Sequence, residues 1–221
     1  MNIGAVPFFA FLGGALSTYL VYHLGTDKNG TSVVVMLLAG VAIGAISGAG
    51  LGLLNYIADD QALRDFSLWS MGSLAGATWS GIGLAFVSLI VIYYYCYRQA
   101  NALNAFLLGE AEARHMGVDV QHLKRSLIIV CAAGVGITVA ITGPIGFIGL
   151  VIPHLGRMIS GPNHKTLLPI SAILGALILL VADMIARSAF APQELPVGII
   201  TAILGAPFFI YLLNKQKGRI A

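Results

Sequence analysis

Residues 33–57 read VVVMLLAGVAIGAISGAGLGLLNYI and contain no charged side chain. A helix of this length crosses the ~30 Å hydrocarbon core of a bilayer. The whole chain has the same character, because 58% of its 221 residues are hydrophobic and only 10% are charged. Its apolar runs are continuous and lack the alternating period of barrel strands. The sequence therefore predicts an all-α, polytopic membrane helix bundle.

Further apolar runs lie on both sides of this segment, so we expect about seven spans within one transmembrane domain, 1–221. The predicted spans are residues 7–24, 33–57, 77–97, 126–143, 145–159, 167–187 and 195–214. The run at 145–159 is the shortest and contains Pro153 close after Pro144. We expect it to form a broken helix, which membrane proteins tolerate where neighbouring protein or water satisfies the freed backbone groups.

The lysine and arginine residues predict the orientation, because cytoplasmic loops carry an excess of them. If the polar segment 98–125 is cytoplasmic, then of the 12 basic residues only Arg64 and Arg187 lie on the outer side of the membrane. The others are Lys28, Arg98, Arg114, Lys124, Arg125, Arg157, Lys165, Lys215, Lys217 and Arg219. This places the N-terminus outside, and the net charge of +3 then reflects topology and gives no indication of nucleic-acid binding.

Four glycines, Gly40, Gly44, Gly48 and Gly52, recur at every fourth position of the 33–57 span. Residues four apart lie on the same helix face, so these glycines form a smooth stripe. Such a stripe lets another helix backbone approach closely, which is how membrane helices associate. It is either a groove for helix packing or a wall that faces a substrate passage, and the two interpretations are compatible.

The polar segment 98–125 contains LLGEAEARHMG at residues 107–117. We expect a short amphipathic helix over residues 102–116, with Gly117 as its stop. One interpretation is a helix that lies on the lipid surface, although such helices usually carry Lys or Arg along the polar face. The other is a surface that a soluble partner binds.

Candidate chemical groups inside the spans are few. Asp183 is an intramembrane carboxylate. Placing a charged side chain inside the bilayer costs free energy, so such a residue is a functional candidate. Asp183 lies four residues before Arg187, however, a spacing that favours an ion pair within one helix. His154 follows Pro153 near a helix end and is more typical of a loop contact than of a metal ligand.

No metal, cofactor or nucleotide site is predicted. His115, His122 and His164 lack partners at metal-ligand spacing. Residues 161–166 lack the second glycine and the preceding strand of a phosphate-binding loop, so any ATP chemistry belongs to another chain. Cys96 and Cys131 fall at or inside predicted spans and are interpreted as small apolar residues.

Several motifs resemble one family of transporters. They are Leu108-Gly109-Glu110-Ala111 with Gly117, GPIGFIGLVIPH at 143–154, Leu167-Leu168-Pro169, Ala182-Asp183 with Arg187, ELPVG at 194–198 and GAPFF at 205–209. The segment around Trp69 and Trp79 adds to them. In this combination and order the chain resembles the permease subunit of binding-protein-dependent ABC importers for iron-siderophores, haem or vitamin B12.

The resemblance implies a type II ABC importer permease made of two inverted repeats, of which 126–214 would be the complete C-terminal one. It implies a homodimer, a substrate-binding protein on the outer side, and an ATP-binding subunit inside that holds ATP and magnesium. The segment 98–125 would be the cytoplasmic coupling loop. The residues that would contact the ATP-binding subunit are Leu108, Gly109, Glu110, Ala111 and Gly117. Arg187 would dock the binding protein, and the glycine stripe would line the pathway.

The first span matches the family's fourth, so the resemblance also implies that three N-terminal helices are absent. We therefore expect a multi-pass permease of the bacterial inner (plasma) membrane that is not itself an enzyme. Iron-siderophore or haem uptake is favoured over vitamin B12. One alternative is a truncated remnant that no longer transports. Another is an intramembrane enzyme that uses Asp183 and His154, which is disfavoured because these residues lie in different spans without a nucleophile.

Overall fold

The computed structural model describes residues 5–27, 30–189 and 194–217, and its elements are helices apart from one two-stranded hairpin. In chain order they are α1 (Ala5–Leu24), β1 (Thr26–Asp27), β2 (Gly30–Thr31), α2 (Val33–Ile57), α3 (Asp60–Ser70), α4 (Trp79–Arg98), α5 (Ala100–Phe106), α6 (Glu110–His115), α7 (Val120–Thr142), α8 (Ile148–Ser160), α9 (His164–Ser188) and α10 (Val197–Lys217). The all-α prediction is therefore confirmed, and each predicted span coincides with a helix.

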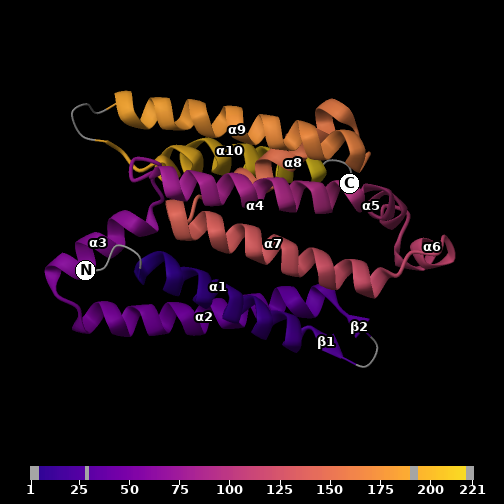
Figure 1. Ribbon diagram of the computed structural model, residues 1–221, viewed down its shortest axis with the longest axis horizontal. Helices are drawn as coiled ribbons and strands as arrows, with labels where there is room; N and C mark the ends of the chain where they lie inside the picture. The colour runs from indigo at the N-terminus through magenta and orange to yellow at the C-terminus, as the bar shows by residue number, and fades with distance from the viewer. Residues whose placement is uncertain (1–4, 28–29, 190–193, 218–221) are drawn as a thin grey trace.

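The long helices run side by side along the longest axis of the molecule (Figure 1). α2 packs on α1, α1 on α7, α7 on α4 and α4 on α9, while α8 and α10 pack against α9 and each other. Among the described residues, α2, α4, α7 and α9 are long and apolar enough to cross a membrane. Shorter apolar helices cover Phe8–Leu24, Ile148–Ser160 and Val197–Leu212.

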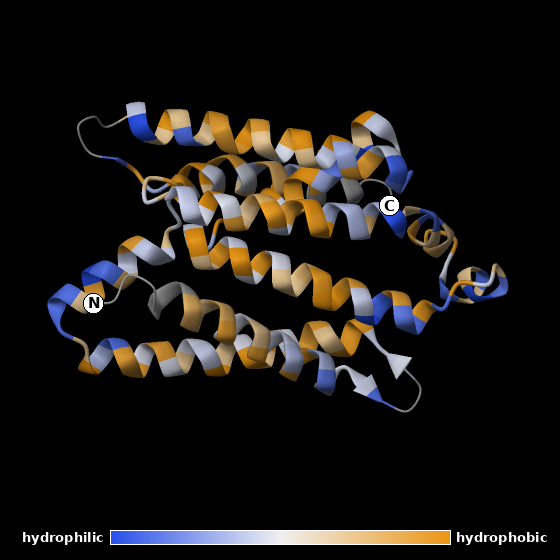
Figure 2. Ribbon diagram, in the orientation of Figure 1, coloured by the Kyte–Doolittle hydropathy of each residue, from blue (hydrophilic) through white to orange (hydrophobic). Residues whose placement is uncertain are grey.

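Hydrophobic residues dominate the middle of these helices, and hydrophilic residues gather at the two ends of the molecule (Figure 2). We call one end, formed by the β1–β2 hairpin, α5, α6 and the start of α7, the α6 end. The opposite end, formed by α3, the α7–α8 connection and the start of α10, is the α3 end. Among the basic residues with described side chains, only Arg64 and Arg187 lie at the α3 end. Lys28 and Arg219 lie outside the described residues, as do the side chains of Lys215 and Lys217.

Several helices begin at a polar N-cap residue. Ser32 accepts a hydrogen bond from the Val35 N–H at the start of α2, and Thr78 does the same for Gly81 in α4. Asp119 and Asn163 cap α7 and α9 in the same way. Each cap satisfies a backbone donor that the first helical turn leaves without a partner.

The structure differs from the sequence prediction in three places. The helix expected over 102–116 is two helices, because Gly109 between α5 and α6 has a φ of +109°. The break expected within 145–159 falls before α8 begins at Ile148, and Pro153 lies inside α8. The third difference is α3, a helix that was not predicted between the spans at 33–57 and 77–97 and that begins where Asp59 accepts a hydrogen bond from the Ala62 N–H at 2.7 Å.

At the α3 end, three chain segments approach one another through glycines. Gly72 and Gly143 have φ values of +70° and +71°. A Cβ on Gly72 would lie 2.6 Å from the Pro144 carbonyl oxygen, and one on Gly198 would overlap the Met71 carbonyl oxygen. The Ser73 N–H donates to the Thr142 carbonyl at 2.8 Å in the same place. We call Gly72, Gly143 and Gly198 the glycine junction.

Candidate functional site

The α5–α6 elbow is the most prominent feature of the α6 end (Figure 1). Its turn is at Gly109, whose positive φ is a conformation that other L-residues rarely adopt. α6 ends at Gly117, where φ is +83° and the N–H donates to the Arg114 carbonyl at 2.9 Å. Gly117 thus stops the helix as predicted, and the two glycines fix the direction in which α6 leaves the bundle.

A small apolar core packs between the elbow and the start of α7. Ala105, Ala113 and Val120 are buried together, and Phe106 and Val118 pack against them. Because alanine is small, α5, α6 and the start of α7 come close together. α6 is therefore fixed to the bundle by packing as well as by its covalent connections.

The outer side of the elbow is apolar but exposed. Leu107, Leu108 and Met116 are 51%, 66% and 62% exposed. We call these three residues the elbow patch. Of the predicted coupling residues, Leu108, Gly109, Ala111 and Gly117 are exposed and Glu110 is half-buried. The structure therefore brings the predicted set together on one projecting surface.

Two polar side chains tie the elbow to the rest of the bundle. Asn104 of α5 donates to Asn163 Oδ1 at 2.9 Å and accepts from the His164 N–H at 2.8 Å, which attaches α5 to the start of α9. Lys124 of α7 lies 2.5 Å from Glu110 Oε1, and Arg114 lies 3.9 Å from Glu110 Oε2. Sequence reasoning did not find Asn104 or Lys124, because their partners are distant in the chain or lie on another helix.

Arg187 lies near the end of α9 at the α3 end. Its Nε donates to Asp183 Oδ2 at 2.7 Å, and its Nη1 lies 3.9 Å from Glu194 Oε1. The predicted pairing of Asp183 with Arg187 is therefore confirmed. The Arg187 side chain remains 46% exposed, so its guanidinium is both fixed in position and accessible.

The glycine stripe lies on α2 and has no packing partner in the described part of the chain. A Cβ added to Gly40, Gly44, Gly48 or Gly52 would find nothing within 4 Å. The described structure thus leaves this face of α2 open. Both interpretations, a surface for another helix and a wall of a passage, stay predictions.

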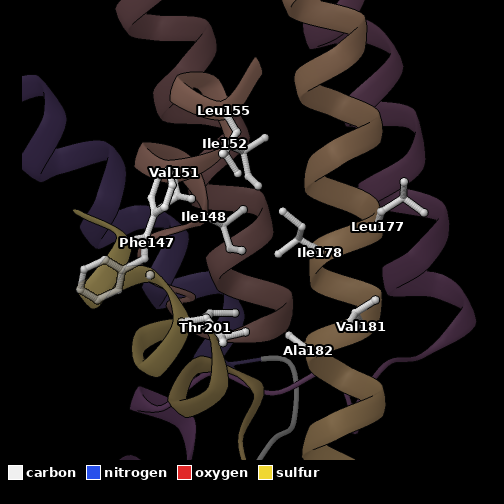
Figure 3. Close-up of a pocket in the computed structure, with 13 residues that line it drawn as sticks. Phe147, Ile148, Val151, Ile152, Leu155, Leu177, Ile178, Val181, Ala182 and Thr201 are labelled. Atoms are coloured by element: carbon white, nitrogen blue, oxygen red, sulfur yellow. The ribbon is translucent and has the colours of Figure 1, made fainter. Parts of the chain in front are cut away.

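An apolar cavity of about 360 Å³ lies between α8, α9 and α10 (Figure 3). Phe147, Ile152 and Ile178 are among its lining residues, and Phe147 has an unusual φ of +66°. Thr201 also lines it, but its hydroxyl donates to the Gly198 carbonyl at 3.0 Å. The lining offers almost no polar partner to a ligand, so this cavity is unsuited to a charged chelate.

The described residues contain no group of three or more His, Cys, Asp or Glu side chains placed to hold a metal ion. Cys96 and Cys131 are free. His164 is engaged at the α9 cap, where its Nδ1 lies 2.9 Å from Asn104 Oδ1. The groups with the best-defined surroundings are therefore those of the elbow and of Arg187.

The helix arrangement, with several helices long and apolar enough to cross a membrane and with polar ends, is that of a multi-pass membrane protein. The chain belongs to the FecCD transport family, which it matches over residues 1–215. It also resembles the solved structure of a metal-chelate type ABC transporter in an inward-facing conformation, with a TM-score of 0.82 and 31% identity. That match covers 96% of this chain and 74% of the other.

Named relatives come from several organisms. The chain is 45% identical to the hemin transport system permease protein HmuU of Yersinia pestis and 42% identical to the vitamin B12 import system permease protein BtuC of Vibrio cholerae, and each match covers 94% of this chain. It is 35% identical to the iron(3+)-hydroxamate import system permease protein FhuG of Bacillus subtilis, in a match that covers 96% of this chain. The chain spans 62% to 63% of the length of these relatives.

Proposed function

We propose that this chain is the membrane-spanning permease of an ABC importer that moves a metal chelate across the inner (plasma) membrane of a bacterium. Haem, a ferric siderophore and vitamin B12 are the candidate substrates of this class. Family membership supports the importer class, and relatives named for hemin, hydroxamate and vitamin B12 transport support the substrate class. The identities to the hemin and vitamin B12 relatives, 45% and 42%, are too close to choose between substrates.

The elbow patch is the observation that carries the proposal. Three large apolar side chains are exposed together at the end of the molecule that holds most of the basic residues. Apolar side chains gathered on an exposed surface mark sites of protein or membrane interaction, and the few basic residues of α5 and α6 disfavour the lipid surface. We infer that α6 docks into an ATP-binding subunit, which would hold the ATP and magnesium, and that Leu108, Gly109, Glu110, Ala111 and Gly117 form the contact.

The opposite end would receive the substrate-binding protein. Arg187 supports this part of the proposal, because Asp183 fixes the guanidinium while almost half of the side chain stays accessible to a partner's carboxylate. The glycine stripe on α2 would face the substrate passage or a second copy of the permease in a homodimer. The open space beside all four of its glycines is consistent with either arrangement.

Binding of the ATP-binding subunit provides the test. Leu108→Ala removes the most exposed side chain of the elbow patch, and such a truncation at the centre of an interface should weaken binding roughly tenfold. Leu68→Ala is the matched control, since Leu68 is also a leucine and is 54% exposed but lies on α3 at the opposite end of the molecule. Binding would be measured with the purified subunit, and hemin uptake in proteoliposomes. Equal affinity in wild type and Leu108→Ala would refute the elbow as the docking site.

Labelling in intact cells tests the orientation. In a variant without Cys96 and Cys131, Glu112→Cys should be shielded from a membrane-impermeant thiol reagent and Asp60→Cys should react. Both side chains are exposed, so access depends on the side of the membrane alone. The reverse pattern would place the elbow outside the cell, where no ATP-binding subunit could reach it.

A further inference from the structure

Lys124 lies near the start of α7, and its side chain contacts three separate elements. Its Nζ lies 2.5 Å from Glu110 Oε1 in α6 and donates to the Thr31 carbonyl oxygen of β2 at 3.0 Å. The same ammonium lies 5.8 Å from the centre of the Phe106 ring in α5. The side chain is only 10% exposed. One group on α7 therefore connects α5, α6 and the β1–β2 hairpin.

The hairpin is held to α7 by a second side chain, Gln121. Gln121 Oε1 accepts a hydrogen bond from the Thr31 N–H at 3.0 Å, so α7 holds both the N–H and the carbonyl of Thr31. A Cβ on Gly30 would lie 2.5 Å from Gln121 Nε2, which places the hairpin directly on this side chain. Thr31 directly precedes Ser32, the residue that caps α2. A shift of Thr31 therefore shifts the beginning of α2.

The position of Lys124 makes these contacts depend on one another. A largely buried ammonium that loses its partner leaves an uncompensated charge, so Lys124 must follow Glu110 or find another acceptor. Its bond to the Thr31 carbonyl is charge-assisted and stronger than a bond between neutral groups. A displacement of α6 thus either carries Thr31 with it or separates Lys124 from one of its two partners.

We propose that Lys124 is a positioning residue that transmits movement of α6 to α2. When a partner moves α6, Glu110 moves Lys124, and Lys124 moves Thr31 and the beginning of the helix that carries the glycine stripe. The proposal rests on the function proposed above, because it takes α6 to be the element that an ATP-binding subunit moves. Lys124 itself contacts neither substrate nor nucleotide.

Uptake and ATP hydrolysis measured side by side in proteoliposomes, with hemin as the probe and the complete transporter complex, test this role. Lys124→Met keeps the aliphatic stem and removes the ammonium. We expect hydrolysis to persist while uptake per ATP falls roughly tenfold, which is typical of a coupling interaction. Lys124→Arg should restore most of the loss. Lys165→Met is the control, because Lys165 is exposed at the same end and forms no ion pair with the described residues.

Gln121→Leu separates transmission from mere support of α6. Gln121 holds the hairpin, and its replacement leaves the Glu110–Lys124 pair in place. Transmission through Thr31 predicts reduced uptake per ATP in this variant too, although less than in Lys124→Met. Normal uptake per ATP in either variant would overturn the proposal.

A distance measurement tests the link without transport. Spin labels at Glu112→Cys in α6 and Val34→Cys in α2, with the native cysteines replaced, should give one narrow distance distribution in the wild type and a broad one in Lys124→Met. An unchanged distribution would overturn the proposal even in a complex that takes up hemin. If the wild-type complex takes up no hemin but Lys124→Met still broadens the distance distribution, the link from α6 to α2 is supported and only the proposed function is contradicted.

Discussion

The two ends of the molecule are held together by different kinds of contact. At the α6 end, long polar side chains bridge elements that lie some distance apart, as Lys124 bridges Glu110 and Thr31. At the α3 end, the glycine junction brings backbones into direct contact without side chains between them. Long side chains that form such bridges can rotate while they keep their partners, whereas backbones in van der Waals contact cannot move apart or closer without repacking. We therefore expect the elements of the α6 end to move relative to one another more easily than those of the α3 end.

The largest effect is expected at the glycine junction. In Gly198→Ala the new Cβ would overlap the Met71 carbonyl oxygen, which is backbone and cannot rotate away. We expect a loss of about 3 kcal/mol in the free energy of unfolding, at the upper end for overpacking. Thermal unfolding in detergent would measure it.

Gly48→Ala is the control for this experiment, because its Cβ would meet nothing within 4 Å. If Gly198→Ala unfolds at the same temperature as Gly48→Ala or at a higher one, the α3 end is not the rigid end, and the contrast with the α6 end fails.

The next effect concerns the link between α5 and α9. Asn104→Ala removes the acceptor of the His164 N–H and the donor to Asn163, and the loss of such a cap costs about 1–2 kcal/mol. Because the α6 end is joined by side chains, the loss should stay local. Hydrogen exchange should become faster at the start of α9 while the glycine junction stays protected.

Asn101→Ala provides the comparison, since Asn101 lies on the same helix but is exposed. Faster exchange throughout α9 in Asn104→Ala would mean that the two ends unfold as one unit.

Much of the fold follows from the order of residues along the chain. The span predicted near 33–57 coincides with α2, because the apolar run lies between the polar residues Ser32 and Asp59. The Asp183–Arg187 pair follows from a spacing of four. Such features depend on neighbours within one helix, and a sequence displays those neighbours directly.

The contacts between distant segments could not be obtained in this way. Lys124 and Thr31 are 93 residues apart, and no spacing rule relates them. The same is true of Gly198 and Met71. The helix α3 did carry a local signal, since Asp59 is a typical N-cap residue, although no helix was predicted between the spans at 33–57 and 77–97. Tertiary proximity, rather than local pattern, decides where the candidate site is assembled.

A smaller effect is expected at the turn of the elbow. Gly109→Ala meets no steric obstacle, so the only cost is the φ of +109°, which for other residues amounts to about 1–2 kcal/mol. Part of this strain should be relieved by a change in the direction of α6. We therefore expect weaker binding of the ATP-binding subunit with little change in the unfolding temperature.

Gly161→Ala is a fair comparison, because Gly161 follows α8 with a φ of +77° and also has an open Cβ position. Equal loss of binding in both variants would show that backbone strain outside the elbow weakens binding of the ATP-binding subunit just as much, and that the elbow has no special role.

The smallest effect is expected on the glycine stripe, and its sign is informative. A Cβ on Gly44 finds nothing within 4 Å, so in this chain alone Gly44→Ala should stabilise α2 by about 0.5–1 kcal/mol, the helix preference of alanine over glycine. If another helix packs on the stripe in the assembled transporter, the same methyl group would hold the two backbones apart, and the variant would destabilise the complex instead. Thermal unfolding of the isolated chain and of the complete complex would give both signs. Stabilisation in both preparations would leave the passage wall as the remaining interpretation, and Gly44→Leu should then reduce hemin uptake without affecting assembly.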